Sequence, residues 1–240
     1  MKTYKSKTTL PIIEAKDIIG YLSESYRDYL AARILFNNNQ LIQACSLANT
    51  TIEKFLKALI STSKKKVKWR HNLSELLIDI KEYDLDLYHS LNTDFLNVLT
   101  KIYSSRYIGS CDTGYNMVIL RNKFLAELDY TYSLLEPKIQ VQEANQTTKK
   151  ITRYDRDISI KEAALLTNNY VLLGIDKTKF IEQLDFVFEL RIHNHQIMEV
   201  SYSTIESKND GKFSFDSLVP KGTENRSFQM CYKAYEEDNK

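Results

Sequence analysis

The sequence predicts a mainly α-helical protein, in which an antiparallel bundle of about five helices is followed by a small α+β C-terminal region. Through the first half of the chain, apolar residues recur at three- and four-residue steps, as they do on one face of a helix. The 240 residues include only 6 Gly and 3 Pro, which also favours helix. The last third instead contains stretches of strand-like composition with partial alternation.

The strongest periodic signal lies between Ala44 and Ile60 and predicts one helix with a broad apolar stripe. Similar spacing runs from Ile18 to Arg33 and ends at the triplet Asn37-Asn38-Asn39. Asparagine favours a helix C-cap and a short turn, so we expect two antiparallel helices that follow each other closely. The stripe of the second helix consists of Ala44, Leu47, Ala48, Ile52, Phe55, Leu56, Leu59 and Ile60.

Three more helices are expected before Pro137. Asn72 can cap the third helix, and Glu75 three residues later completes a variant of the capping box. The fourth helix carries the apolar residues from Phe95 to Ile102. After a polar stretch, the fifth runs from Val118 to Leu135 and closes the bundle.

These patterns divide the chain into a helical bundle at 14–138, a linker or solvated extension at 139–157, and an α+β accessory region at 158–240. The linker range is rich in Gln, Thr, Lys and Arg and lacks apolar periodicity. In the accessory region, Ile160 to Leu173 is expected to form one helix. The strand-like segments after it are Phe186 to Ile192, Gln196 to Ile205, Lys212 to Phe215 and Phe228 to Tyr235.

Composition excludes several classes of protein. Apolar residues make up 43% and charged residues 27%. A chain of this composition is too apolar to be disordered. Charges and hydroxyls interrupt residues 1–13 where a signal peptide needs an apolar run, so we expect a cytoplasmic protein without a membrane segment. The three cysteines are widely spaced and lack zinc-site spacing, so we expect neither a metal nor a cofactor.

The helix order and three short motifs resemble the HEPN domain family. The motifs are Asn49-Thr-Thr-Ile-Glu53-Lys54-Phe-Leu-Lys57-Ala-Leu-Ile60, His71-Asn-Leu-Ser-Glu-Leu-Leu77 and Ser105-Arg106-Tyr107. The resemblance covers the bundle and leaves the C-terminal region outside. It implies a homodimeric bundle that associates with nucleotides or RNA, often in toxin-antitoxin or other defence-type systems, and many members are metal-independent ribonucleases.

Ribonucleases of this family share an Arg that is followed, after four to six intervening residues, by a His. The guanidinium holds a phosphate while the imidazole transfers a proton. At the corresponding distance from Arg106 stand a cysteine, an aspartate and a threonine. Lys66 and His71 come nearest to the pattern, but lysine lacks the planar fork of arginine and the pair lies in a loop before the third helix. The protein is therefore expected to be non-catalytic, with the question of an enzyme left open.

The residues expected to bind a nucleotide or RNA are Lys57, Arg70, His71, Arg106 and Tyr107. Arg70 and His71 end a loop in which cations surround Trp69, so phosphates can pair with the cations and a base can stack on the indole. The same loop can equally be a solvated connection between helices, with His71 serving only as a hydrogen-bond partner at the helix start.

The other candidates also have alternative interpretations. Arg106 and Tyr107 match a family position near the ligand cleft, but a cation there also complements the negative end of a helix. Lys57 can reach an anion in a dimer groove or pair with Glu53 on the helix surface, and we favour the surface pair.

Three functions remain open. The first is a non-catalytic homodimer that binds a nucleotide or RNA. The second is a divergent metal-independent ribonuclease in which Arg106 and His71 meet in space. The third is a protein-interaction or scaffolding module with a protein partner in a defence-type system.

Overall fold

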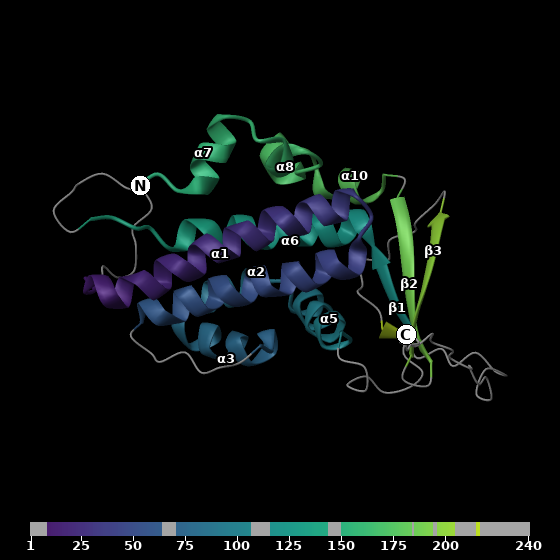
Figure 1. The fold of residues 1–240 in the computed structure, drawn as a ribbon, viewed down its shortest axis with the longest axis horizontal. Coiled ribbons are helices and arrows are strands. Elements are labelled where there is room, and N and C mark those ends of the chain that lie inside the picture. Colours follow the sequence, from purple (N-terminus) through teal and green to yellow (C-terminus); the bar gives the residue numbers. More distant parts are fainter. Residues whose placement is uncertain are drawn as a thin grey trace, which may run out of the picture.

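The computed structural model describes residues 9–63, 71–106, 116–143, 150–183, 185–193, 196–204 and 215–216. In these ranges it has ten α-helices, one short 3-10 helix and a sheet of four strands. The helices form a bundle and the sheet lies at one end of it (Figure 1). The expected fold class, a helical bundle followed by a small α+β region, is confirmed.

Helices α1 (Ile12–Asn37) and α2 (Leu41–Thr62) form the long antiparallel pair that the sequence predicts. The turn between them includes Asn39, whose φ of 59° lies in the left-handed region that asparagine tolerates. Helix α2 is the centre of the core because α1, α3, α5 and α6 all pack against it. Its predicted apolar stripe is confirmed, with every member buried except Leu47, which is partly buried.

The helices α3 (Leu73–Tyr83), α4 (Leu85–Ser90) and α5 (Thr93–Ser104) follow. Asn72 caps α3 as predicted, since its side-chain oxygen accepts a hydrogen bond of 2.9 Å from the Ser74 amide. Short helix α4 was not expected. Asp84 begins it by accepting a hydrogen bond of 3.0 Å from the Leu87 amide. Figure 1 shows α3 and α5 on one side of α2, and α1 and α6 on the other.

The expected fifth helix is wrong at its start. Val118 belongs to strand β1 (Asn116–Leu120), and helix α6 begins only at Arg121 and ends at Leu135. Strand β1 pairs antiparallel with β2, which places Ile119 opposite Phe188. Both side chains are buried in the core, so this pairing with a segment far along the chain determines the conformation of an apolar stretch that alone is compatible with helix.

The other strands largely follow the sequence pattern. β2 (Asp185–His193) and β3 (Gln196–Thr204) lie at two of the predicted strand segments and pair as an antiparallel hairpin, and β4 (Phe215–Asp216) is short. The strand order is β3-β2-β1-β4, so one strand of the bundle region completes the sheet of the C-terminal region. The segment Phe228 to Tyr235 and residues 212–214 lie outside the described residues.

Short helices occupy the stretch between bundle and hairpin: α7 (Arg153–Ser159), α8 (Ala163–Leu166), α9 (Tyr170–Leu173) and α10 (Lys177–Ile181). The single helix expected from Ile160 to Leu173 is wrong, because Lys161 and Asn168 both have φ of 56° and interrupt it. Helix α7 begins inside the range 139–157 that we assigned to a linker, whereas the proposed division into domains stays a prediction.

A local signal that we did not use marks the start of α7. Thr152 and Asp155 form a reciprocal capping box, in which each side chain accepts a hydrogen bond from the backbone amide of the other residue. Figure 1 shows α7 and α8 packed along α1 and α6, on the side away from α3 and α5.

A buried polar network joins this stretch to the bundle. Arg33 of α1 forms an ion pair with Asp129 of α6, and both side chains are fully buried. Arg33 also donates hydrogen bonds to the carbonyl oxygens of Ala164 (3.2 Å) and Thr167 (2.5 Å). The Tyr29 hydroxyl donates to Asp129 at 2.8 Å. Burial raises the pKa of Tyr29 and, against the opposing effect of Arg33, that of the Asp129 carboxyl.

None of the helices in the described ranges is both long enough and apolar enough to cross a membrane.

Candidate functional site

The structure describes three of the five residues that the sequence indicated as a ligand site: Lys57, His71 and Arg106. Arg70 and Tyr107 lie outside the described residues. Lys57 is on α2, His71 lies just before α3, and Arg106 lies just after α5. They surround two further side chains, Glu53 and Tyr103, and we call these five residues the α2–α5 site.

The centre of the α2–α5 site is a buried ion pair. Lys57 Nζ lies 2.6 Å from Glu53 Oε1, and the two side chains are 7% and 6% exposed. The expected surface pair is therefore wrong, because Glu53 and Lys57 are both buried. A buried pair of charges contributes little net stability by itself, but removal of one partner leaves a charge that neither water nor protein compensates.

His71 is bonded to the same carboxylate oxygen. Its Nδ1 lies 3.0 Å from Glu53 Oε1, and 57% of its side chain is exposed. The buried Glu53 thus orients the imidazole of His71, while the ring stays accessible to a ligand. Because Nδ1 is engaged, Nε2 is the ring nitrogen left for a ligand or a proton transfer.

Tyr103 connects His71 with Arg106. The His71 and Tyr103 rings are stacked with centroids 6.5 Å apart and an interplanar angle of 27°. The Arg106 guanidinium carbon lies 3.6 Å from the centroid of the Tyr103 ring. Arg106 Nε also donates to the Tyr103 carbonyl oxygen at 3.0 Å, so the cation complements the C-terminal end of α5 as well. Arg106 is exposed and its position is fixed by these contacts.

A line of polar side chains leads along α2 to this site. Ser46, Asn49, Glu53 and Lys57 recur at three- and four-residue steps and are all buried. Among the described residues, three of their buried polar atoms have no hydrogen-bond partner: Ser46 Oγ, Asn49 Nδ2 and Glu53 Oε2. Buried polar atoms of this kind are uncommon because each one loses its hydration. This line of buried polar residues therefore indicates that this side of α2 does more than pack against its neighbours.

Sequence reasoning named three residues of the site and missed how they are joined. Glu53 appeared in the sequence only as a surface partner of Lys57, and Tyr103 was not among the predicted site residues. The signal for the buried line was present as four polar residues at helical spacing inside the most apolar helix. The contact of Tyr103 with His71 has no such local signal, because His71 precedes α3 whereas Tyr103 lies at the end of α5.

This arrangement suits an anion that carries a flat ring. Arg106 offers a planar set of donors to a phosphate, and Tyr103 with His71 offers aromatic surface beside it. In the described part of the chain, no three His, Cys, Asp or Glu side chains gather as a metal site requires.

Comparison with known proteins identifies the helical region. Residues 20–113 match the family model of the HEPN domain, a range that begins in α1 and includes Lys57, His71 and Arg106. The resemblance seen in the motifs is thereby confirmed for the N-terminal half of the chain. Neither the curated proteins nor the solved structures contain a significant match.

Proposed function

We propose that the HEPN domain at residues 20–113 makes this protein a non-catalytic binder of RNA or nucleotides, with the α2–α5 site as its contact surface. The observation that carries the proposal is the contact of His71 and Arg106 with the same Tyr103 ring. It joins an exposed guanidinium to an aromatic surface, which are the two elements that proteins use to hold a phosphate and a base.

The roles of the residues differ. Arg106 is exposed and can pair with a phosphate in its present position. His71 and Tyr103 provide the stacking surface. Lys57 is buried against Glu53, so it acts by holding the carboxylate that orients His71. Arg70 and Tyr107 remain proposed ligand residues because they adjoin His71 and Arg106 in the sequence.

Binding of labelled single-stranded RNA to the full chain, followed by fluorescence anisotropy at several salt concentrations, tests the proposal. Arg106→Gln should weaken binding about tenfold and reduce the dependence of log K on log salt by about 0.7, the value for one phosphate contact in single strands. Arg27→Gln is a matched control, since Arg27 is an exposed arginine on α1 that pairs with Glu24. No binding at low salt, or equal losses in the two variants, would refute the proposal.

A divergent metal-independent ribonuclease is the second candidate, and one observation favours it. Glu53 engages Nδ1 of His71, as a carboxylate does when it orients a catalytic imidazole. Arg106 lies nearby, because it contacts the Tyr103 ring on which His71 is stacked. In this reading Nε2 of His71 transfers a proton while Arg106 holds the phosphate.

Cleavage of RNA in the presence of a chelator distinguishes the two candidates. The enzyme requires cleavage that is lost in His71→Ala and Arg106→Ala while both variants remain folded. RNA binding without cleavage supports the non-catalytic binder. Cleavage that persists unchanged in both variants would exclude this site as its origin.

We also propose that the protein is a homodimer, which is what the family resemblance implies, and that it acts in a toxin-antitoxin or other defence-type system with a protein partner. Sedimentation equilibrium at several concentrations tests the dimer directly. A mass that stays monomeric up to micromolar concentrations would contradict it.

A further inference from the structure

A cavity of about 280 Å³ lies between α1, the C-terminal end of α6 and the segment that leads into α7. Its floor consists of the aromatic side chains of Tyr26, Phe55 and Tyr132, which are 4%, 2% and 3% exposed. Apolar side chains from α1, together with Ile139, Val141 and Ile151, form part of its walls. The cavity does not share a residue with the α2–α5 site.

The aromatic floor is held in place by its own contacts. The Tyr26 hydroxyl donates a hydrogen bond of 2.8 Å to Asp157 of α7. The Tyr132 ring is stacked on Tyr29, with centroids 4.0 Å apart and an interplanar angle of 6°. The Tyr154 ring meets Tyr26 edge-on at 5.9 Å. A ligand would therefore enter a site that is already formed, which reduces the entropy lost on binding.

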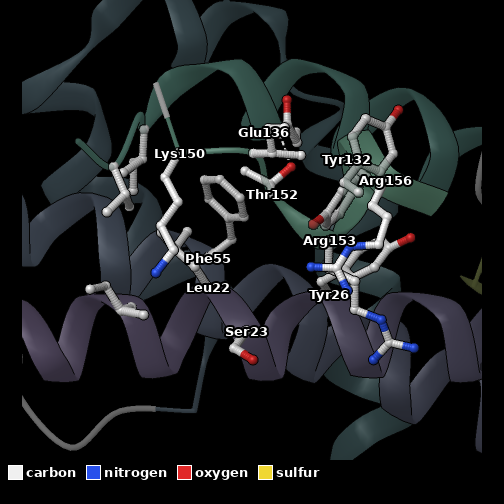
Figure 2. Close-up of a pocket in the computed structure, with 15 residues that line it drawn as sticks. Leu22, Ser23, Tyr26, Phe55, Tyr132, Glu136, Lys150, Thr152, Arg153 and Arg156 are labelled. Atoms are coloured by element: carbon white, nitrogen blue, oxygen red, sulfur yellow. Dashed lines mark hydrogen bonds between the residues drawn. The ribbon is translucent and has the colours of Figure 1, made fainter. Parts of the chain in front are cut away.

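Cations surround the mouth. Figure 2 shows Phe55 in the middle, with Lys150 on one side and Arg153 and Arg156 on the other. Arg153 Nε lies 3.5 Å from Asp157, whereas no ion pair of Lys150 or Arg156 occurs among the described residues. Glu136 is the acidic residue of the lining, and its carboxylate accepts a hydrogen bond of 3.4 Å from the Thr152 hydroxyl.

We propose that this cavity binds a small organic anion with a flat aromatic body, such as an aromatic carboxylate. The rings of Tyr26, Phe55 and Tyr132 contact the body, and Lys150 or Arg156 pairs with the acidic group at the mouth. The enclosed aromatic floor favours a small ligand over a protein segment, which would meet only the rim.

This site is independent of the proposed RNA binding. Phe55 lies two residues from both Glu53 and Lys57, so it is turned by about 200° around α2 and faces the opposite side of the helix. Loss of one activity therefore says nothing against the other.

The probes for a test are naphthalene-2-carboxylate and 2-naphthalenemethanol, which share a ring system and differ in charge. Isothermal titration calorimetry with the full chain should show binding of the carboxylate, with the alcohol bound about tenfold more weakly because it lacks the charge-assisted contact. Equal affinities would overturn the assignment of an anion site and leave an apolar groove. Absence of binding by both probes would overturn the proposal entirely.

Two kinds of variant locate the binding. Ser23 is exposed and lines the cavity, so Ser23→Trp should fill the mouth and abolish binding without a change in the core. Lys150→Gln combined with Arg156→Gln should weaken the carboxylate about tenfold or more and leave the alcohol unchanged. Lys179→Gln, an exposed cation of α10 outside the cavity, is the matched control.

Each variant must keep the cooperative thermal transition of the parent protein to count. Carboxylate affinity that is unchanged in Ser23→Trp would place the binding elsewhere and refute this site. Lys179→Gln removes one cation and the double variant removes two, so a control loss about half as large in binding free energy would show that only the general charge of the protein matters, which also refutes it.

Discussion

Replacement of Arg33 by methionine should destabilise the protein by about 3–5 kcal/mol, the range found when one partner of a buried ion pair is removed. Arg33 is fully buried, so its charge is compensated only by the protein. Asp129 supplies the opposite charge, and the carbonyl oxygens of Ala164 and Thr167 accept two further hydrogen bonds. In Arg33→Met these three acceptors lose the Arg33 guanidinium together.

The size of the loss follows from these groups. Each hydrogen bond from a charged donor contributes about 1.5–3 kcal/mol, and the apolar methionine side chain returns part of this through burial. The Tyr29 hydroxyl still donates to Asp129, which limits the penalty on the carboxylate. Chemical denaturation of Arg33→Met and of the control Arg27→Met measures the difference. The control should change by less than about 0.5 kcal/mol, because Arg27 is exposed.

The stability of the variant should also depend more strongly on pH than that of the parent protein. Burial already raises the pKa of Asp129, and the loss of Arg33 removes the main effect that opposes the rise. The folded state then keeps a proton that the unfolded state releases near its ordinary pKa of about 4. Stability is therefore fully present below that pH and falls as the pH rises through the raised pKa of the folded state.

A double-mutant cycle with Asp129→Asn decides whether the pair is responsible. The combined variant should be less destabilised than the sum of the single ones by about 1–3 kcal/mol. A loss below about 1 kcal/mol in Arg33→Met, or strict additivity, would show that the ion pair does not hold the helices together and would refute this reasoning.

Three further predictions concern two sets of buried groups and one helix cap. Burial raises the pKa of Tyr26, Tyr29 and Tyr132, so the unfolded state loses these protons at a lower pH than the folded state does. The free energy of unfolding should therefore fall by about 4 kcal/mol per pH unit above about pH 10, which denaturation at alkaline pH can measure. Glu53→Gln leaves Lys57 buried without its counter-charge and should cost about 3–5 kcal/mol in the same assay, whereas Glu182→Gln, at an exposed carboxylate, should change stability by less than about 0.5 kcal/mol. Asn72→Ala removes the cap of α3 and should cost about 1 kcal/mol, whereas Asn72→Asp should cost little.

Much of the bundle could be predicted because its signals are local. The stripe of α2 and the cap at Asn72 each involve residues within a few turns of one another. Strand β1 could not be predicted in this way. Its residues form a strand because Asn116 pairs with Arg191, a contact between distant parts of the chain. The break at Asn168 is likewise decided by tertiary contacts, since its side-chain amide donates to Asn37 at 2.8 Å.

The site was predictable in part for a similar reason. Family resemblance directed attention to Lys57, His71 and Arg106, which the structure brings around Glu53 and Tyr103. The burial of Glu53 could not be read from the helix pattern, because an apolar stripe shows one covered face and the side of α2 that carries Glu53 is covered as well. Arg33 shows the same limit, since a charged residue within an apolar stripe does not reveal its partner.

The separation of contact residues from positioning residues gives the last prediction. Lys57 Nζ lies 2.6 Å from Glu53 and its side chain is 7% exposed, so a phosphate would have to displace the carboxylate to reach it. Arg106 is exposed, so a phosphate can approach its guanidinium from solvent. Lys57→Met should therefore weaken RNA binding because His71 is misplaced, and it should leave the slope of log K against log salt unchanged. Arg106→Gln should reduce that slope by about 0.7.

The same anisotropy titrations at several salt concentrations measure both variants, and thermal melting confirms that Lys57→Met is folded. His71→Gln should resemble Lys57→Met, because both remove the oriented imidazole without removing a charge that contacts phosphate. If Lys57→Met lowers the salt dependence as much as Arg106→Gln does, then the lysine leaves Glu53 and pairs with phosphate in the complex. In that case the segments that cover Lys57 must move when RNA binds, and the buried Lys57–Glu53 ion pair exists only in the free protein.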